Sequence, residues 1–258
     1  MPPNVSIITV NYNHRAGLEK TVASVLAQTW PLLDYLVIDG GSTDGSAGII
    51  QANKDRIGYW VSERDAGLYD AMNKGVKAAK GDWILFMNSD DVFVDDRVVA
   101  DIFSQEHADA DLVYGDVRRR YDDYGESRVF PAEPPTVLPW RMNCSHQSLF
   151  TRRSLLLAHP FGDGISSDYE FLLTCYSESR RFKHVDRLVS EVSAGGVSDA
   201  NRLLSIGLRW RALSRLGMTS PRLALDYFYI ALRGLAGHYG KRLLGRRLSA
   251  WVLRHRRI

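Results

Sequence analysis

Short apolar runs and stretches of helical periodicity alternate over the first hundred residues of the chain. The apolar runs are rich in β-branched residues and predict strands at residues 5–12, 35–41, 58–65 and 83–88. Apolar residues recur at helical spacing between these strands, in the segments 18–26 and 71–79. This alternation predicts βαβ units and therefore an α/β fold with a Rossmann-like, mostly parallel central sheet flanked by helices.

The second hundred residues are less regular. Residues 111–117 predict a strand, and residues 118–130 predict a hairpin or a flexible, solvated loop. The proline-rich segment 130–139 is incompatible with a central strand or the interior of a helix. Residues 166–179 carry an apolar face at helical spacing behind two serines that can cap a helix.

Polar side chains stand where each of the first four predicted strands ends. They are Asn11, Asp39, Asp65 and the adjacent pair Asp90 and Asp91. A single aspartate at a strand end is usually a helix cap, but ligands of open α/β sheets bind outside the carboxyl ends of the strands. Because four consecutive strands deliver side chains to one edge, the pattern predicts a ligand site there.

The residue types at this edge limit the classes of ligand that the site can bind. The chain lacks the GxGxxG and GxxxxGK[ST] motifs of nucleotide-binding loops and the GxSxG motif of hydrolases. Carboxylate and amide oxygens favour Mg²⁺ or Mn²⁺, which share their coordination with substrate phosphates. The edge is therefore predicted to bind a divalent cation and a phosphorylated ligand. The alternative, that Asp90 and Asp91 cap a helix starting near Asp95, stays open at this point.

Composition fits an ordinary globular protein, with 45% hydrophobic and 24% charged residues in 258. The two cysteines, Cys144 and Cys175, argue against a disulfide framework or a zinc site and fit a reducing compartment. The N-terminal segment has no basic region typical of a signal peptide, and no run of about 18 apolar residues predicts a membrane span.

Charge divides the chain near residue 200. Residues 201–258 contain 13 Lys and Arg and one acidic residue, a net charge of +12, whereas residues 1–200 carry −9. Apolar and aromatic residues alternate with the basic ones at helical spacing, which favours an amphipathic extension on an anionic membrane surface. Nucleic acid is not expected as a partner because the segment is too apolar. Packing on the preceding domain or on a second subunit, as in a homodimer, remains the alternative.

Several segments together resemble family 2 glycosyltransferases of the GT-A fold, particularly bacterial enzymes that build exopolysaccharide or O-antigen. The segments are "SIITVNYN", "VIDGGSTDGS", "SERDAGLYDAMNKGVKAAKGDWILFMNSDD", "HQSLFTRRSL" and "SSDYEFLL", and the resemblance covers about residues 4–195. It implies a catalytic domain over 1–200, with a nucleotide-binding half at 1–100 and an acceptor half at 101–200, followed by the basic helical extension at 201–258.

The resemblance also implies roles for residues at the strand ends. Thr9, Asn11 and Asp39 would hold the base and ribose of the nucleotide, and Asp65 would add a further nucleotide contact. The DxD element of the family reads Asn88-Ser89-Asp90 here, with Asp91 following. Asn88 can bond a ribose hydroxyl but brings no charge. Mn²⁺ or Mg²⁺ is expected on Asp90 or Asp91, with Asp90 preferred.

Asp168 matches the general base of the family, although Ser167 replaces the usual glutamate before it. Its alternative role is that of a first-turn helix residue favoured by the helix dipole. His146 and Asp116 are weaker candidates for the acceptor cleft, since a lone histidine is usually structural and Asp116 can cap a loop. The run Arg118–Arg120 is expected to be solvated.

The predicted function is an inverting, metal-dependent transfer of a sugar from a nucleotide-sugar, expected to be a UDP-sugar, to a lipid-linked saccharide in surface polysaccharide synthesis. The enzyme is expected in the cytoplasm, bound peripherally to the inner face of the cytoplasmic membrane. One rival is a sugar-nucleotide pyrophosphorylase, which should carry a glycine-rich loop in place of "NYNHRAG". The other is a non-catalytic nucleotide-binding or scaffold component of a polysaccharide assembly complex.

Overall fold

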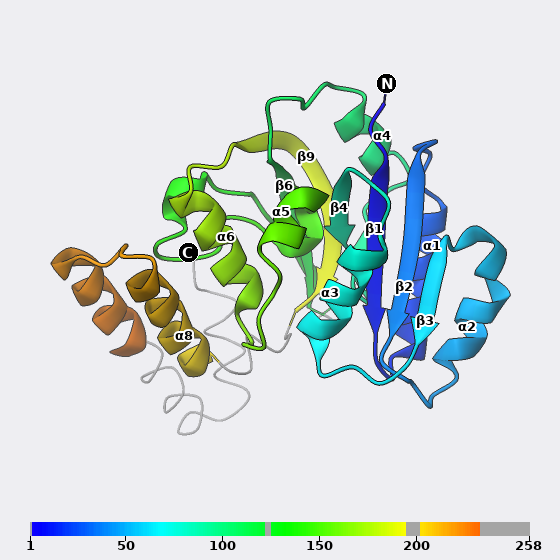
Figure 1. Cartoon of the computed structure of the whole chain (residues 1–258), viewed down its shortest axis with the longest axis horizontal. Helices are drawn as coiled ribbons and strands as arrows, with labels where there is room; N and C mark the ends of the chain where they lie inside the picture. The colour runs from blue at the N-terminus through cyan, green and yellow to red at the C-terminus, as the bar shows by residue number, and fades with distance from the viewer. Residues whose placement is uncertain (1, 122–124, 195–201, 233–258) are drawn as a thin grey trace.

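A computed structural model of the chain describes residues 2–121, 125–194 and 202–232 (Figure 1). The strands are β1 (Val5–Asn11), β2 (Leu33–Asp39), β3 (Tyr59–Ser62), β4 (Trp83–Phe86), β5 (Val92–Phe93), β6 (Leu112–Tyr121), β7 (Glu126–Phe130), β8 (Leu149–Arg152) and β9 (Phe182–Ser193). The α-helices are α1 (Arg15–Leu26), α2 (Ser46–Ala52), α3 (Leu68–Ala78), α4 (Val98–Phe103), α5 (Arg153–Ala158), α6 (Ser167–Ser177) and α8 (Arg202–Arg215). The 3₁₀ turns are η1 (Lys54–Arg56), η3 (Pro135–Val137) and η4 (His146–Ser148), and residues 221–232 form a further helical segment.

One sheet runs through the molecule in the order β3-β2-β1-β4-β8-β6-β9-β5, with β7 paired to β6. The first four strands along this order are parallel, as the sequence predicts. Beyond β4 the sheet becomes mixed, because β8 pairs antiparallel with both β4 and β6 while β9 runs parallel to β6. The carboxyl ends of the parallel strands therefore meet at one edge of the sheet.

Both faces of the sheet are covered by helices. On one face, α3, α5, α6 and α8 contribute to a single apolar cluster, and on the other face α1, α2 and α4 contribute to a second (Figure 1). Successive side chains of the central strand β1 contribute to opposite clusters. Ile8 faces the first cluster, Ile7 faces the second, and both are completely buried. A strand buried on both faces reads as a continuous apolar run, which is the signal seen in the sequence.

The second half of the chain agrees with the sequence pattern in one place and departs from it in another. Residues 118–121 pair antiparallel with residues 126–129, as expected of the hairpin, one of the two predicted alternatives. Strand β9 was not predicted, because charged residues interrupt its apolar positions and leave no clean alternation. Its pairing with β6 and β5 makes it a strand nonetheless.

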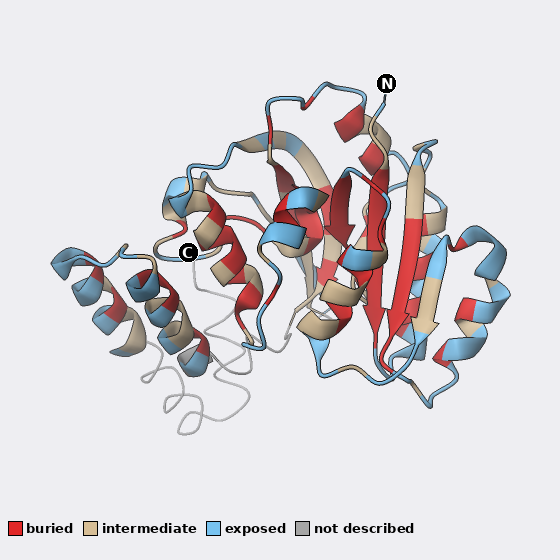
Figure 2. Cartoon of the chain, viewed as in Figure 1, coloured by how far each residue is buried: buried red, intermediate tan, exposed pale blue. Residues whose placement is uncertain are grey.

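The described part of the basic extension packs on helix α6 and on the connection after β7. Leu213 of α8 is completely buried in the same cluster as Leu172 of α6, and Leu223 and Tyr227 of the helical segment join it. Figure 2 shows buried positions along both α8 and the helix that follows it. The Tyr227 hydroxyl donates a hydrogen bond to the Pro139 carbonyl at 3.1 Å. Among the described residues, no helix has the length and apolar character needed to cross a membrane. The strongly basic residues 233–258 lie outside the described residues.

Candidate active site

The ends of β1 and β2 are tied together by polar side chains. Asn11 and Asp39 occupy the same register position, and the Asn11 amide donates to an Asp39 carboxylate oxygen at 2.7 Å. Asp39 also accepts hydrogen bonds from the hydroxyls of Ser42 and Ser62, at 2.5 and 2.6 Å. The Ser89 hydroxyl, in the loop after β4, donates to the side-chain Oδ1 atom of Asn11 at 2.8 Å. Of the strand-end residues predicted to converge, Asn11 and Asp39 therefore contact each other directly.

Asp39 is completely buried, yet its environment stabilises the ionised form. Burial alone would raise the pKa of Asp39, but hydrogen bonds from Ser42, Ser62 and Asn11 lower that pKa below the ordinary value for a carboxyl. The edge therefore carries a fixed negative charge at neutral pH.

Asp65 lies close to the end of β2, since a Cβ placed on Gly40 would stand 3.2 Å from an Asp65 oxygen. Its carboxylate pairs with Lys74 of α3 at 2.5 Å. Asp65 and Glu63 raise the pKa of Lys74 and hold it in the charged form. Thr9 differs from these residues: it is completely buried, and its hydroxyl is within 3.0 Å of the Tyr35 hydroxyl. Thr9 thus lies inside the core rather than at the open edge.

The loop after β4 places Asp90 in an unusual conformation with φ of +80°, in the left-handed region that non-glycine residues seldom adopt. One Asp90 oxygen accepts from Lys20 of α1 at 2.7 Å, and the other accepts from Arg120 of β6 at 2.9 Å. Ser193 of β9 donates to that second oxygen at 2.5 Å. Burial would raise the pKa of Asp90, but Lys20, Ser193 and Arg120 together lower it, so the carboxylate is ionised.

Asp91 is a different kind of carboxyl from its neighbour. It is buried, one oxygen accepts a hydrogen bond from the Gln147 amide at 2.6 Å, and burial raises its pKa to about 6. Neither aspartate caps helix α4, which begins at Val98, so the capping alternative is wrong for this pair. Of these two adjacent aspartates, Asp90 is the one with a lowered pKa and a partly open carboxylate, with 14% of its side chain exposed.

The 3₁₀ turn η4 sends consecutive side chains to different parts of the site. His146 Nε2 lies 3.0 Å from the Asn88 amide nitrogen, and His146 Nδ1 lies 3.4 Å from an Asp168 oxygen. This geometry suits a neutral imidazole that accepts from Asn88 at Nε2 and directs its Nδ1–H towards Asp168. His146 therefore connects the loop after β4 with the start of α6.

Asp168 lies in the first turn of helix α6, and two side chains contact its carboxylate. The Tyr69 hydroxyl of α3 donates to one carboxylate oxygen at 2.9 Å, and His146 approaches the other. Burial would raise the pKa of Asp168, but His146 and Tyr69 lower it below the ordinary value. With 19% of its side chain exposed, Asp168 is an oriented, ionised carboxylate that is partly open to solvent.

Asp116 does not belong to this group. Its carboxylate accepts a hydrogen bond from the backbone N–H of Ala132 at 2.8 Å and lies 3.6 Å from His184. Among the contacts of the described residues, none joins it to Asp168 or His146. Its geometry is that of a residue that anchors the connection after β7.

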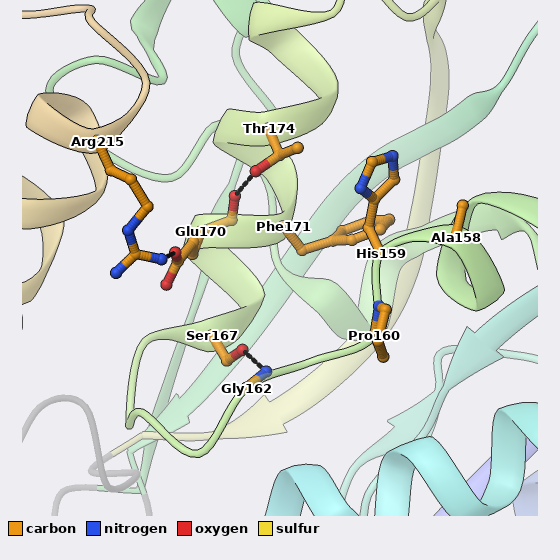
Figure 3. Close-up of a pocket in the computed structure, with 9 residues that line it drawn as sticks. All are labelled: Ala158, His159, Pro160, Gly162, Ser167, Glu170, Phe171, Thr174 and Arg215. Carbon is orange, nitrogen blue, oxygen red and sulfur yellow. Dashed lines mark hydrogen bonds and ion pairs between the residues drawn. The ribbon is translucent and has the colours of Figure 1, made fainter.

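Ser167, which replaces the glutamate expected before Asp168, accepts a hydrogen bond from the Gly162 N–H at 2.6 Å. It lines a pocket of about 390 Å³ whose lining residues do not include Asp168 (Figure 3). Glu170, which pairs with Arg215 of α8, borders the same pocket (Figure 3). Ser167 thus holds the loop before α6 in place and does not share the position of the predicted base.

The oxygen atoms of this edge fit a hard divalent cation with few protein ligands. Asp90 offers an ionised carboxylate, and the Asn88 Oδ1 atom is buried without a hydrogen-bond partner. The described residues contain no group of three or more His, Cys, Asp or Glu arranged to hold a metal. Mg²⁺ and similar ions are commonly bound by one or two carboxylates, with water and substrate phosphates completing the shell.

Comparison with known proteins identifies the family. The profile of "Glycosyl transferase family 2" matches residues 6–165, and the chain belongs to this family. It is 32% identical over 208 residues to the PGL/p-HBAD biosynthesis glycosyltransferase of Mycobacterium tuberculosis, covering 76% of this chain and 80% of that protein. The predicted family and the predicted enzyme class, a glycosyltransferase, are therefore confirmed.

Solved structures confirm the predicted GT-A fold. The chain is similar to S. aureus TarS 1-349 in complex with UDP-GlcNAc, with a TM-score of 0.63 and 16% identity over 81% of this chain and 66% of that one. It is also similar to the mannosyltransferase PcManGT from Pyrobaculum calidifontis in complex with GDP-Man and Mn²⁺. There the TM-score is 0.66 and the identity 15%, over 98% of this chain and 79% of that one.

Sequence reasoning missed four side chains that organise the site: Lys20, Arg120, Tyr69 and Gln147. Tyr69 and Gln147 stand inside the quoted motifs "GLYDAMN" and "HQSLF", so a signal was present for them. Arg120 was expected to be solvated as part of a basic run, and this was wrong, because it reaches Asp90 and Ser193. No local pattern marked it, since its partners are 30 and 73 residues away.

Proposed function

We propose that the protein is an inverting, metal-dependent glycosyltransferase that moves a sugar from a nucleotide-sugar, expected to be a UDP-sugar, to a saccharide acceptor in the synthesis of a cell-surface glycan. The observation that carries this proposal is the chain of contacts from Asp168 through His146 to Asn88. It joins the predicted general base to the loop that is predicted to hold the donor.

In this proposal Asp168 accepts the proton of the acceptor hydroxyl while its oxygen attacks the anomeric carbon. A general base of this kind contributes typically about 10²–10⁴-fold to the rate. The lowered pKa of Asp168 keeps the carboxylate ionised at neutral pH, and Tyr69 and His146 fix its orientation. Attack assisted by one base, on the face opposite the leaving group, inverts the configuration of the sugar.

The donor is proposed to lie across the strand ends. Asn11, Asp39 and Asp65 would hold the base and ribose, and the unpaired Oδ1 atom of Asn88 would accept a hydrogen bond from a ribose hydroxyl. Thr9, being buried against Tyr35, would support this edge from inside the core rather than by direct contact.

Asp90 is the residue proposed to hold Mn²⁺ or Mg²⁺, with the buried Asp91 supporting the loop from beneath. When bound, the cation stabilises the negative charge that develops on the departing diphosphate. The mannosyltransferase PcManGT was solved with Mn²⁺, which supports a divalent cation as the cofactor but does not identify the residue that holds it. The structures of TarS and PcManGT contain a UDP-sugar and a GDP-sugar, respectively, so the first experiment should identify the nucleotide of the donor.

The test is hydrolysis and transfer across a panel of UDP-, GDP- and dTDP-sugars in Mn²⁺, Mg²⁺ or EDTA. The enzyme should turn over one of these donors when Mn²⁺ or Mg²⁺ is present, and most of this turnover should be lost in EDTA. Calorimetry should show UDP binding more tightly with Mn²⁺ than with EDTA, and Asp90→Ala should lose that difference. Nucleotide binding without turnover of any donor would favour the non-catalytic scaffold, and equal UDP affinity with and without metal would contradict the role of Asp90.

We further propose that the acceptor is lipid-linked and that the enzyme meets it at the cytoplasmic, anionic membrane surface through an outer stripe on the helical segment 221–232. Large apolar side chains at helical spacing are exposed along this stripe: Leu225, Phe228, Tyr229 and Leu232. Leu225 and Phe228 are 70% and 64% exposed. The net charge of +12 over residues 201–258 argues for an anionic occupant, with each basic residue near such a surface worth about 1 kcal/mol.

Vesicle sedimentation of the full chain tests the outer stripe. The protein should bind vesicles that contain anionic lipid at low salt, release at high salt because the charges are screened, and ignore zwitterionic vesicles. Leu225→Ser and Phe228→Ser should weaken binding, whereas Leu157→Ser, at an exposed apolar position on α5, should not. Absence of vesicle binding, together with a homodimer that Phe228→Ser dissociates, would replace the membrane by a second copy of the chain.

A further inference from the structure

The imidazole of His146 lies between an amide and a carboxylate, which approach different ring nitrogens. Nε2 lies 3.0 Å from the Asn88 amide nitrogen, and Nδ1 lies 3.4 Å from an Asp168 oxygen. A neutral imidazole has one N–H and one lone pair, so it can donate a hydrogen bond from only one of its two nitrogens. The hydrogen bond made at one nitrogen therefore decides whether the other nitrogen carries the hydrogen.

The Asn88 amide decides this in favour of Nδ1. Its nitrogen only donates, so Nε2 must accept, and the ring hydrogen lies on Nδ1 and is directed towards Asp168. The Oδ1 atom of the same amide is buried and has no hydrogen-bond partner in the described part of the chain. Turning the amide over would place Oδ1 against Nε2 and require the opposite tautomer, so the two arrangements differ in a measurable way.

An aspartate at position 88, as in a DxD element, could not act in the same way. A carboxylate only accepts hydrogen bonds, so Nε2 would have to carry a hydrogen in order to contact it. In a neutral ring, Nδ1 would then direct a lone pair towards the Asp168 carboxylate, and this contact would be repulsive. In a charged ring, the imidazolium beside Asp168 would make the carboxylate a weaker base. Both forms are less suited to a general base at Asp168 than the arrangement with Asn88.

We propose that Asn88 is a positioning residue, whose amide nitrogen fixes the Nδ1–H tautomer of His146 and through it the orientation of the Asp168 carboxylate. The proposal rests on the proposed function, because it takes Asp168 as the general base. It adds that one amide serves both substrates of the reaction. The Oδ1 atom of Asn88 is proposed to contact the donor, and its Nδ2 atom acts through His146 on the base that activates the acceptor.

NMR spectra that correlate ring protons and nitrogens test the tautomer directly, with the full chain labelled with ¹⁵N-histidine. The chain has seven histidines, and the signals of His146 are identified by their loss in His146→Asn. At about pH 8.5, above the ordinary titration range of histidine, the wild type should show a protonated Nδ1 and an unprotonated Nε2. Asn88→Asp should show a protonated Nε2. The control Asn53→Asp makes the same change where the amide donates to the Ile49 carbonyl, and it should leave the His146 signals unchanged.

Two substitutions of His146 test which ring nitrogen supports turnover. The amide nitrogen of His146→Asn lies as far along the side chain as Nδ1, whereas that of His146→Gln lies as far as Nε2. His146→Asn should keep kcat within about threefold of the wild type, and His146→Gln should lower it about tenfold, the usual effect of one lost hydrogen bond. The affinity for UDP should be unchanged in both, because His146 is not among the residues proposed to hold the donor.

A double-mutant cycle separates the effect of Asn88 on His146 from its effect on the donor. Asn88→Asp should lower kcat about tenfold in the wild type, because the hydrogen bond to Asp168 is lost or altered. It should have no further effect on kcat in His146→Asn, where no tautomer remains to be fixed. A cost that arises only at the donor would be the same in both backgrounds and would overturn the positioning role.

Thermal melting checks that each variant is folded. The proposal is supported by an unprotonated Nε2 in the wild type, a protonated Nε2 in Asn88→Asp, and a higher kcat in His146→Asn than in His146→Gln. A wild type with a protonated Nε2, or equal kcat in the two His146 variants, overturns the positioning role and leaves the proposed function standing. Absence of turnover with every donor of the panel overturns the proposed function and the positioning role with it.

Discussion

Replacing Asp168 by asparagine tests the proposed reaction most directly. The substitution keeps an oxygen that can accept from the Tyr69 hydroxyl, now 2.9 Å from the carboxylate, but removes the negative charge that a general base needs. Donor binding should be nearly unchanged, because the contacts of Asp168 are with Tyr69, His146 and its own helix rather than with the strand ends.

The expected loss in turnover follows from the role of the base. General-base catalysis contributes about 10²–10⁴-fold, which corresponds to about 3–5 kcal/mol in the activation barrier. The free energy of unfolding should change by about 1 kcal/mol or less, since the His146 contact is long at 3.4 Å and the Tyr69 hydrogen bond can be kept. Catalysis and stability should therefore separate in this variant.

The assay is the rate of UDP release from the best donor of the panel, with UDP affinity and urea unfolding measured on the same preparations. Glu170→Gln is the matched control, because Glu170 lies on the same helix but pairs with Arg215 and lines a pocket to which Asp168 does not contribute. Its turnover should stay near normal. Near-normal turnover with Asp168→Asn would refute the assignment and make His146 the next candidate for the base.

Three further substitutions probe the scaffold and the site. Gly75→Ala should lower the free energy of unfolding, measured by urea denaturation, by about 1–2 kcal/mol, because the new Cβ would lie 2.5 Å from the Ile8 side chain. The control Gly48→Ala should be neutral or stabilising, because its Cβ would meet no atom within 4 Å. Because the pKa of Asp39 is lower in the folded than in the unfolded state, its carboxylate stabilises the fold above the unfolded pKa of about 4, and this stabilisation is lost as pH falls through the folded pKa. Asp39→Asn should therefore reduce the loss of stability between about pH 5 and 3, measured by urea denaturation. Tyr69→Phe removes a hydroxyl that orients the proposed base, and it should lower kcat about tenfold with little change in UDP affinity.

The sequence by itself determined the parallel half of the fold and the edge at which polar residues gather. Strands buried on both faces must be continuous apolar runs, and the carboxyl ends of parallel strands must share an edge, so local patterns were sufficient. The pairing of Asn11 with Asp39 and the exposure of Asp90 at this edge follow from those rules. The family motifs added Asp168, which periodicity alone gave only as a first-turn helix residue.

The tertiary structure decided which side chains of the site contact one another, because these contacts join residues far apart in the chain. His146 and Asn88 are separated by 58 residues. The pKa is lowered at Asp90, which is surrounded by cations, and raised at Asp91, which is buried. The burial of Thr9 against Tyr35 and the packing of α8 on α6 were equally invisible to local pattern. Charge and periodicity describe what a segment can do, whereas burial and partner geometry depend on which other segment the fold brings against it.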